Sequence, residues 1–139
     1  MIVLDTNVLS EVVKPRPSPD VVRWLADQDR VALFTTTITQ AEMLYGLERL
    51  ADSPRKQSLR LAVEGMFAED FEGRVLNFDQ PSAAAYAQLH HQRRTHGLTI
   101  SQSDTMIAAI AISIGAAVAT RNTKDFEDCG IPLINPWQP

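Results

Sequence analysis

The sequence predicts an α/β protein built as three layers, with a mostly parallel sheet of about five strands between two layers of helices. The first observation is a series of short apolar runs of the kind that form fully buried strands. The second is that segments with apolar residues at helical spacing separate these runs. Strands that alternate with helices form parallel sheets, because each helix returns the chain to the end of the sheet where the next strand begins.

The elements can be placed in order along the chain. The first strand is the apolar run at residues 1–4, which ends at Asp5, and the other strands are predicted at 31–35, 74–78, 117–120 and 132–134. Helices are expected to start at Thr6 and then to cover 18–27, 37–47, 54–67, 79–96 and 101–114. Caps and prolines mark the helix starts, and Gly97 and Gly115 mark two of the ends.

Composition limits the kinds of protein that this chain can be. With 139 residues and 45% hydrophobic content, it is expected to form a single domain over 1–139 around one well-covered core. A net charge of -4 gives no basic excess for broad contact with duplex nucleic acid, so any nucleic-acid site must be local, or helped by a metal or a second subunit. The one cysteine, Cys129, excludes an intrachain disulfide and a thiolate metal cluster.

The same features predict a cytoplasmic protein. A chain with a single cysteine fits a reducing compartment. No basic region precedes the N-terminal apolar run, and Asp5 interrupts that run almost at once, so a signal peptide is not expected. The longest apolar stretch, 107–119, contains Ser113 and Gly115 and is too short to span a bilayer.

Three acidic residues are expected at one edge of the sheet. Asp5 closes the first strand, and Glu42 is placed in the first turn of the helix that leaves the second strand. Asp104 opens the helix that ends at Gly115, and because a parallel strand follows, the N-terminus of this helix should lie at the carboxyl edge. In such sheets the active crevice lies outside the carboxyl ends of the strands.

Taken singly, each acid also has a structural explanation. Asp5 can cap the helix at Thr6, Glu42 can complete a capping box with Thr39, and Asp104 can complement a helix dipole. Taken together, several carboxylates at one low-dielectric edge repel one another unless a cation neutralises them. Carboxylate oxygens, without cysteine or paired histidine ligands, favour Mg²⁺ or Mn²⁺ over zinc.

Four segments carry a resemblance to a known family. They are IVLDTN at 2–7, TITQAE at 37–42, SDTMIAA at 103–109 and ATRNTKDF at 119–126. In order and spacing, along essentially the whole chain, they resemble the signature segments of a PIN domain. Within that family the chain is similar to the VapC toxins of type II toxin–antitoxin systems, particularly the FitB-like branch, which the ending INPW at 134–137 also resembles.

The resemblance implies a metal-dependent endoribonuclease that is inhibited by a small cognate antitoxin. It implies an acidic core of Asp5, Glu42 and Asp104 that holds Mg²⁺ or Mn²⁺ and hydrolyses phosphodiester bonds of RNA. It also implies a homodimer that reaches operator DNA only through the antitoxin. The family's fourth acidic position falls on Asn122 here, so the number of metal ions stays open.

Other side chains are weighed beside the acids. Thr6 and Thr120 can donate hydroxyl groups to the acidic core, in support of the metal ligands. Arg121 and Lys124 lie next to the expected site and can hold RNA phosphates, although exposed loop cations are more often only solvated. The three histidines fit helix-end roles. Apolar side chains of the helices belong to the core, with a partly exposed subset available for a dimer face or an antitoxin groove.

Two alternative functions remain at this level. One is a catalytically weak PIN domain that acts as an RNA- or antitoxin-binding module, with Asn122 as the sign of lost chemistry. The other is phosphoryl transfer through an aspartyl phosphate, which predicts an acid two residues after Asp5, where Asn7 stands. Dinucleotide and P-loop sites are excluded, because no glycine-rich phosphate loop follows any strand.

Overall fold

A computed structural model describes residues 1–98 and 100–139. Within them a five-stranded sheet has the order β3-β2-β1-β4-β5, and every neighbouring pair is parallel. The strands are β1 (Ile2–Leu4), β2 (Leu33–Thr36), β3 (Val75–Leu76), β4 (Ala117–Ala119) and β5 (Leu133–Ile134). The predicted α/β fold with a parallel sheet is therefore confirmed.

The strand order places a topological switch point beside β1. The chain builds outward from β1 through β2 to β3, and then returns to the other side of β1 for β4 and β5. Register pairs Leu4 with Ala119 at the carboxyl ends of β1 and β4. Ligands of open parallel sheets bind outside the carboxyl ends of the strands at such a point. The residues that follow Leu4 and Ala119 therefore lie where a functional site is expected.

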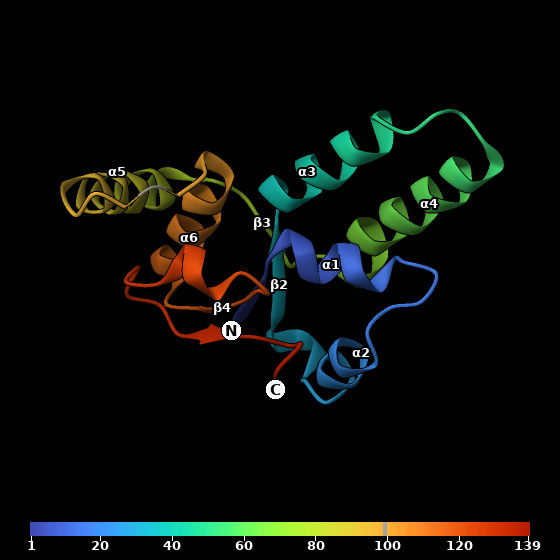
Figure 1. Ribbon diagram of the computed structural model, residues 1–139, viewed down its shortest axis with the longest axis horizontal. Coiled ribbons are helices and arrows are strands. Elements are labelled where there is room, and N and C mark those ends of the chain that lie inside the picture. Colours follow the sequence, from blue (N-terminus) through green and yellow to red (C-terminus); the bar gives the residue numbers. More distant parts are fainter. Residues whose placement is uncertain (99) are drawn as a thin grey trace.

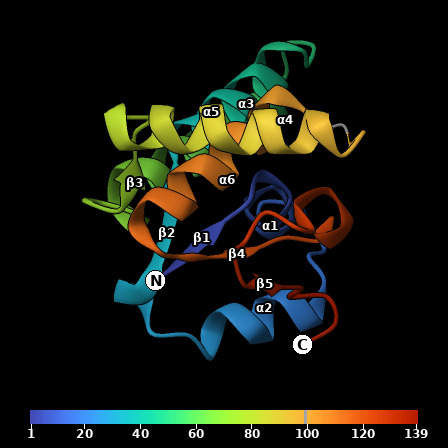
Figure 2. The same ribbon diagram turned by 90° about the vertical axis from the view of Figure 1, so that its left-hand side faces the viewer.

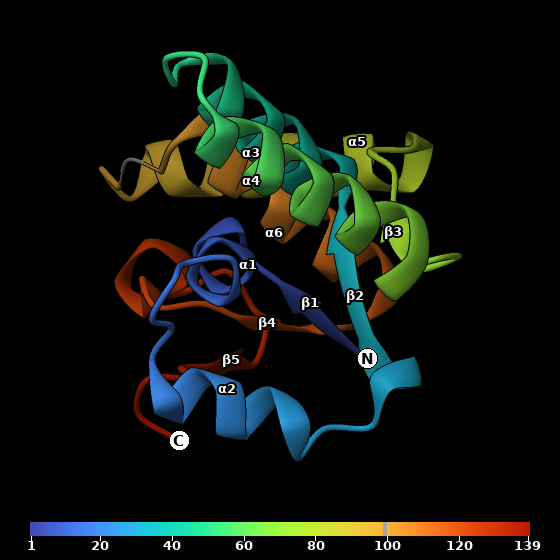
Figure 3. The same ribbon diagram turned by 90° about the vertical axis from the view of Figure 1, so that its right-hand side faces the viewer.

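Six α-helices cover the sheet in the described residues, on both of its faces. They are α1 (Thr6–Val12), α2 (Pro19–Ala26), α3 (Thr37–Glu48), α4 (Pro54–Gly65), α5 (Gln80–Thr95) and α6 (Gln102–Ile114). Figure 1 shows α5 and α6 on one side of the sheet and α1, α2 and α4 on the other. In Figure 2, α5 lies across α6, and in Figure 3, α3 and α4 run side by side.

Two hydrophobic clusters join these helices to the sheet. Alternate residues of β1 point to opposite faces, so Val3 packs with Ile107 of α6 and Leu89 of α5, whereas Leu4 packs with residues of α1, α3 and α4. All of these side chains are almost completely buried. The central strand is thus covered on both faces, as its continuous apolar run predicts.

The beginning of β2 differs from the prediction. Residues 31 and 32 belong to a 3₁₀ turn, Arg30–Ala32, in which the Asp29 side chain accepts a hydrogen bond from the backbone N–H of Val31. Val31 is 70% exposed, so its apolar character does not reflect burial in the sheet. The local side-chain cap therefore delays the strand until Leu33.

Helix α3 begins at Thr37, as predicted, but its cap and the end of the following helix differ from the prediction. The N-cap of α3 is Thr36, whose Oγ1 accepts a hydrogen bond from the backbone N–H of Thr39 at 3.1 Å, so Thr39 is not the cap. The helix predicted over 54–67 leaves α geometry after Gly65 and continues as a π-helical turn, Met66–Asp70. This turn buries Met66 and Phe67 in the cluster around Leu4.

The remaining helices agree closely with their capping signals. Ser101 caps α6, since its Oγ accepts a hydrogen bond from the backbone N–H of Asp104 at 3.1 Å. Asp79 caps α5 in the same way through Ser82. None of the helices in the described residues combines the length and the apolar character that crossing a membrane would require.

Replacing Gly115 with alanine is expected to destabilise the protein by about 1 kcal/mol. Gly115 ends α6 with φ 67°, a left-handed conformation, although an added Cβ would meet no atom within 4 Å. The matched control is Gly65→Ala, since Gly65 has helical φ -62° and equal space, and this change should stabilise by about 0.5–1 kcal/mol. Urea unfolding measures both, and an equal effect of the two variants would contradict the assignment.

Candidate active site

Asp5 is fixed at the switch point by contacts with the start of α1 and with the end of β4. Its side chain is 3% exposed. One carboxylate oxygen, Oδ1, accepts a hydrogen bond from the backbone N–H of Thr6 at 2.8 Å, and the other, Oδ2, accepts one from Thr120 Oγ1 at 2.8 Å. Thr120 directly follows β4, and the backbone N–H of Asp5 donates to the carbonyl of Ala119. The carboxylate is therefore held between the ends of β1 and β4.

The buried position of Asp5 is unfavourable for its charge. Burial raises the pKa of Asp5 to about 6, and the negative charges of Asp104 and Glu42 add to this effect. Hydrogen bonds from Thr120 and Thr6 act in the opposite direction and lower the pKa. At pH values above about 6, Asp5 is ionised although its burial favours the protonated form.

Glu42 reaches the same edge from α3. The sequence predicted it in the first turn of its helix, but α3 begins at Thr37, so Glu42 stands in the second turn. Its Oε1 accepts a hydrogen bond from Thr6 Oγ1 at 2.7 Å, and the same hydroxyl lies 3.0 Å from Thr39 Oγ1. Because Thr36 caps this helix, Glu42 does not complete a capping box with Thr39. Helix capping is therefore not the structural role of the Glu42 side chain.

Asp104 approaches from α6. It lies in the first turn of that helix and is half-buried. Burial raises the pKa of Asp104, the Ser101 hydroxyl lowers it, and the charges of Asp125 and Glu42 raise it further. Since Asp104 also contributes to the raised pKa of Asp5, the three predicted acids influence one another across one edge of the sheet.

A polar network links this edge to the loop after β4. Thr120 Oγ1 accepts hydrogen bonds from the backbone N–H of Asn122 at 3.1 Å and from Asn7 Nδ2 at 3.3 Å. Asn7 Oδ1 in turn accepts a hydrogen bond from the backbone N–H of Arg121 at 3.2 Å. Asn7 is not among the site residues predicted from the sequence. Its place in the first turn of α1, beside a strand-end aspartate, was the available signal.

The two cations proposed for RNA have different surroundings. The guanidinium of Arg121 lies 5.2 Å from the centre of the Trp137 ring, a cation–π contact with the C-terminal segment. Lys124 lies in the 3₁₀ turn Thr123–Phe126 and is exposed, and it makes no ion pair among the described residues. Arg121 thus has a structural contact that Lys124 lacks.

The chemistry of the donors suits a hard divalent cation. Each oxygen of Asp5 accepts one hydrogen bond and retains capacity for a second interaction, and all three acids offer carboxylate oxygens. A cation would also relieve the mutual repulsion that raises the pKa values of Asp5 and Asp104. Across 1–98 and 100–139, no three acidic, histidine or cysteine side chains are already gathered closely enough to hold a metal ion.

The fold and this acidic edge define a PIN domain. The chain belongs to the PIN-domain family, whose model matches residues 2–131. It is similar to VapC ribonuclease Y4jK of Sinorhizobium fredii, with 41% identity over 100% of this chain and 99% of the relative. It is also similar to Toxin FitB of Neisseria gonorrhoeae, with 39% identity over 99% of each chain. The predicted resemblance to VapC toxins of the FitB-like branch is thus confirmed.

Solved structures agree with the sequence comparisons. The crystal structure of FitAcB from Neisseria gonorrhoeae matches with a TM-score of 0.93 and 39% identity over 100% of both chains. The structure of FitAB bound to a DNA fragment matches with a TM-score of 0.92 and 40% identity over 99% of this chain and 96% of that one. Among more distant relatives is the tRNA(fMet)-specific endonuclease VapC of Shigella flexneri, 29% identical over 96% of each chain.

Replacing Thr120 with valine is expected to destabilise the metal-free protein by about 1–3 kcal/mol at pH 7, because the buried Asp5 carboxylate loses a donor. The matched control is Thr35→Val, since Thr35 is equally buried but donates only a long 3.4 Å hydrogen bond to the carbonyl of Leu4. Urea unfolding compares the two variants. If Thr120→Val is no more destabilising than Thr35→Val, the hydroxyl does not support Asp5.

Proposed function

We propose that this protein is the toxin of a toxin–antitoxin pair and acts as a Mg²⁺- or Mn²⁺-dependent endoribonuclease. The observation that carries the proposal is the meeting of Asp5, Glu42 and Asp104, from three different helix or strand ends, at the switch point of a PIN-family sheet. The ribonuclease names of its relatives support the reaction class. The substrate is RNA, and the reaction is hydrolysis of a phosphodiester bond.

Asp5 and Asp104 would hold the cation, and Glu42 would complete its shell or orient the attacking water. When bound, the ion would neutralise charge that develops on the phosphate and make water a better nucleophile at neutral pH. Asp5 and Asp104 supply the negative charge that attracts it.

The neighbouring polar groups have supporting tasks in this proposal. Thr6 holds Glu42 through the 2.7 Å hydrogen bond, and Thr120 holds Asp5 through the 2.8 Å hydrogen bond. Asn122 replaces an acid with an amide, so the core carries three acidic charges. This charge supports one tightly held ion, with a second bound only when substrate phosphate contributes further oxygen ligands. Lys124 would contact RNA phosphate.

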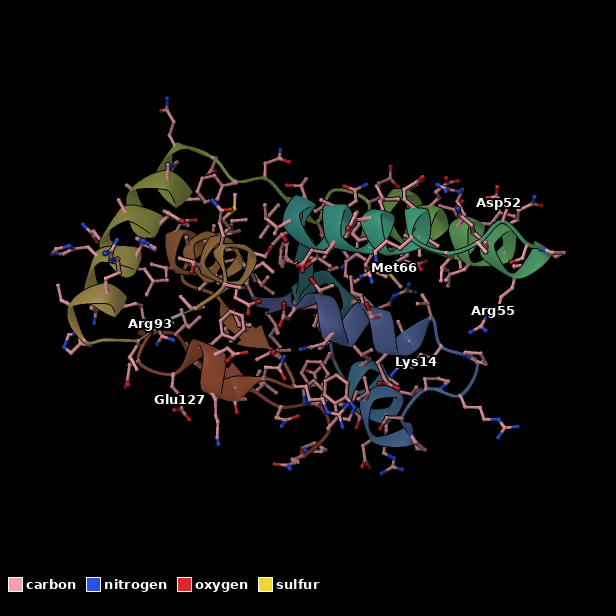
Figure 4. The ribbon with its side chains drawn as sticks, turned by 45° about the horizontal axis from the view of Figure 1, so that its top comes forward. Lys14, Asp52, Arg55, Met66, Arg93 and Glu127 are labelled. Carbon is pink, nitrogen blue, oxygen red and sulfur yellow. The ribbon has the colours of Figure 1, made fainter. Side chains whose placement is uncertain are left out.

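An apolar groove beside the acids supports binding of an antitoxin. It encloses about 460 Å³ between α1, α3 and α4, and its apolar lining includes Val13, Met43, Leu47 and Leu59. Glu42 stands at its border, together with Lys14 and Arg55, which Figure 4 shows near the end of α1 and at the start of α4. An amphipathic antitoxin helix would place its apolar face in such a groove. Occupation of the groove would cover the approach to Glu42.

We extend the proposal to assembly and location by likeness to the relatives. The structure of FitAB with a DNA fragment is the model for a toxin–antitoxin complex on DNA. For this protein we propose a homodimer in the cytoplasm that reaches operator DNA through its antitoxin. Sedimentation of the purified protein, alone and with antitoxin, measures the dimer directly.

Asp104→Asn is expected to lower kcat for RNA cleavage by at least about 100-fold, because the change removes a charge that attracts the cation. Asp128→Asn is the matched control, since Asp128 is exposed and its left-handed φ of 61° suits asparagine equally well. It should cleave as fast as the parent. Cleavage of total RNA with Mg²⁺ or Mn²⁺ measures both.

Equal cleavage by Asp104→Asn and the parent would disprove the role of Asp104. A parent protein that binds RNA or antitoxin but shows no metal-dependent cleavage would instead support the binding-module function.

Gly46→Leu is expected to weaken antitoxin binding by about tenfold, since the added side chain occupies the groove. Gly46 is exposed and a Cβ there meets no atom within 4 Å, so the side chain starts into open space, and the melting temperature of the variant shows whether the fold is kept. Gly65→Leu is the control, in a helix but outside the groove lining. Titration with the small protein encoded immediately upstream of this gene measures binding. Equal affinity of the two variants would show that the antitoxin binds outside the groove. The lack of a small gene immediately upstream would contradict the proposed toxin–antitoxin pair.

A further inference from the structure

A second hollow lies beside the acidic edge, on the side of the loop after β4. It encloses about 400 Å³ and is lined by residues 121–125 together with Asn135 and Gln138. Its lining is polar, in contrast to the apolar groove between α1, α3 and α4. Two hydrogen bonds link the wall of the hollow to the acidic site. The backbone N–H of Asn122 donates to Thr120 Oγ1, and the Thr120 hydroxyl donates to the Asp5 carboxylate.

One wall of the hollow, the C-terminal segment, is held in place by its own contacts. Asn135 Oδ1 accepts a hydrogen bond from the backbone N–H of Trp137 at 2.9 Å, and the backbone N–H of Gln138 donates to the carbonyl of Asn135 at 3.0 Å. The Trp137 ring lies against Arg121 of the opposite wall. The Nδ2 amide of Asn135 donates no hydrogen bond within the described residues, so this side chain brings a hydrogen-bond donor to the lining of the hollow.

The other wall, formed by the loop after β4, is held in place by the buried side chain of Arg93. Figure 4 shows Arg93 of α5 lying between that helix and the loop that carries Glu127. Arg93 is 4% exposed, and its guanidinium donates hydrogen bonds to the backbone carbonyls of Asp125, at 3.0 Å, and of Glu127. The ring of Phe126, between these two residues, is 1% exposed. These contacts fix the path of residues 123–127, so the hollow is formed before any ligand arrives.

The charges around the hollow favour an anion despite the acidic chain. The net charge of the protein is -4, yet Arg121 and Lys124 outnumber Asp125 in the lining. Four other cations of the described residues, Lys14, Arg23, Lys56 and Arg60, are paired with acids. Lys124 is exposed and makes no ion pair in the same part of the chain. A phosphate near Lys124 would therefore gain a contact without breaking another.

We propose that this hollow is a subsite for one nucleotide of single-stranded RNA, with Lys124 contacting a backbone phosphate and the Asn135 amide hydrogen-bonding the edge of the base. The inference rests on the proposed ribonuclease activity and deepens it, since the subsite would select which phosphodiester enters the acidic edge. Bases of unpaired RNA expose hydrogen-bonding edges that carboxamides read. A free Nδ2 donor selects bases that present an acceptor at that point. Arg121 acts on the subsite indirectly, by holding Trp137.

The decisive variant is Asn135→Asp. It is nearly isosteric and keeps an oxygen for the backbone N–H of Trp137, but it replaces the amide donor with a negatively charged acceptor, so the change in the bases next to the cut is the result specific to base recognition. Asn77→Asp is the matched control, because it makes the same change at an exposed asparagine that lines a different pocket, next to β3. Melting temperatures show whether both variants are folded.

We expect Asn135→Asp to raise KM for RNA by about tenfold, with a smaller change in kcat, and to alter the bases found next to the cut. Asn77→Asp should match the parent in both respects. KM is measured on a single-stranded oligoribonucleotide, and the cut sites are mapped by sequencing the products of total RNA. Equal KM and equal cut sites for the two variants would overturn the subsite.

Failure of the ribonuclease proposal is recognised separately. If the parent cleaves no RNA with Mg²⁺ or Mn²⁺, the proposed activity is wrong, and binding of a fluorescent eight-nucleotide RNA then decides the subsite. About tenfold weaker binding by Asn135→Asp than by Asn77→Asp would support it. Equal binding by the two variants, or no binding by the parent, would overturn it.

Discussion

The structure depends on the carboxylate of Asp5, which is buried although burial disfavours its negative charge. Asp5 ends the central strand, and its two oxygens are satisfied by the N-terminus of α1 and by Thr120 after β4. The same contacts that tolerate the charge also join β1 to β4 at the switch point. Burial and two neighbouring acids raise its pKa to about 6, so the fold retains an unfavourable charge.

The surroundings of Asp5 divide into two surfaces of opposite character. On the side of α3, the groove is apolar and borders Glu42, which suits an amphipathic helix. On the side of the loop after β4, the hollow is polar and carries Lys124, which suits RNA. Glu42 lines the groove and residues 121–125 line the hollow, so in the proposed function an antitoxin and RNA would contact different side chains on the two sides of Asp5.

Capping signals and apolar runs predicted most of the fold, since both are local. Ser101 and Asp79 cap the helices that the sequence assigned to them, and Leu4 is buried as its apolar run required. The errors arose where a neighbouring side chain or a tertiary contact changed a boundary. Asp29 caps the turn that delays β2, and the π-helical turn after Gly65 buries Met66. No periodicity in a single segment reports such contacts.

The sequence by itself determined the parallel α/β fold and the convergence of three acids, because the alternation of strands and helices dictates which element ends share an edge. Only the tertiary structure decided how the loop after β4 and the C-terminal segment are held in place. It turned Arg121 onto Trp137 and buried Arg93 against the carbonyls of Asp125 and Glu127. These pairs lie far apart in the chain and follow no spacing rule, so their contacts exist only once the layers have packed.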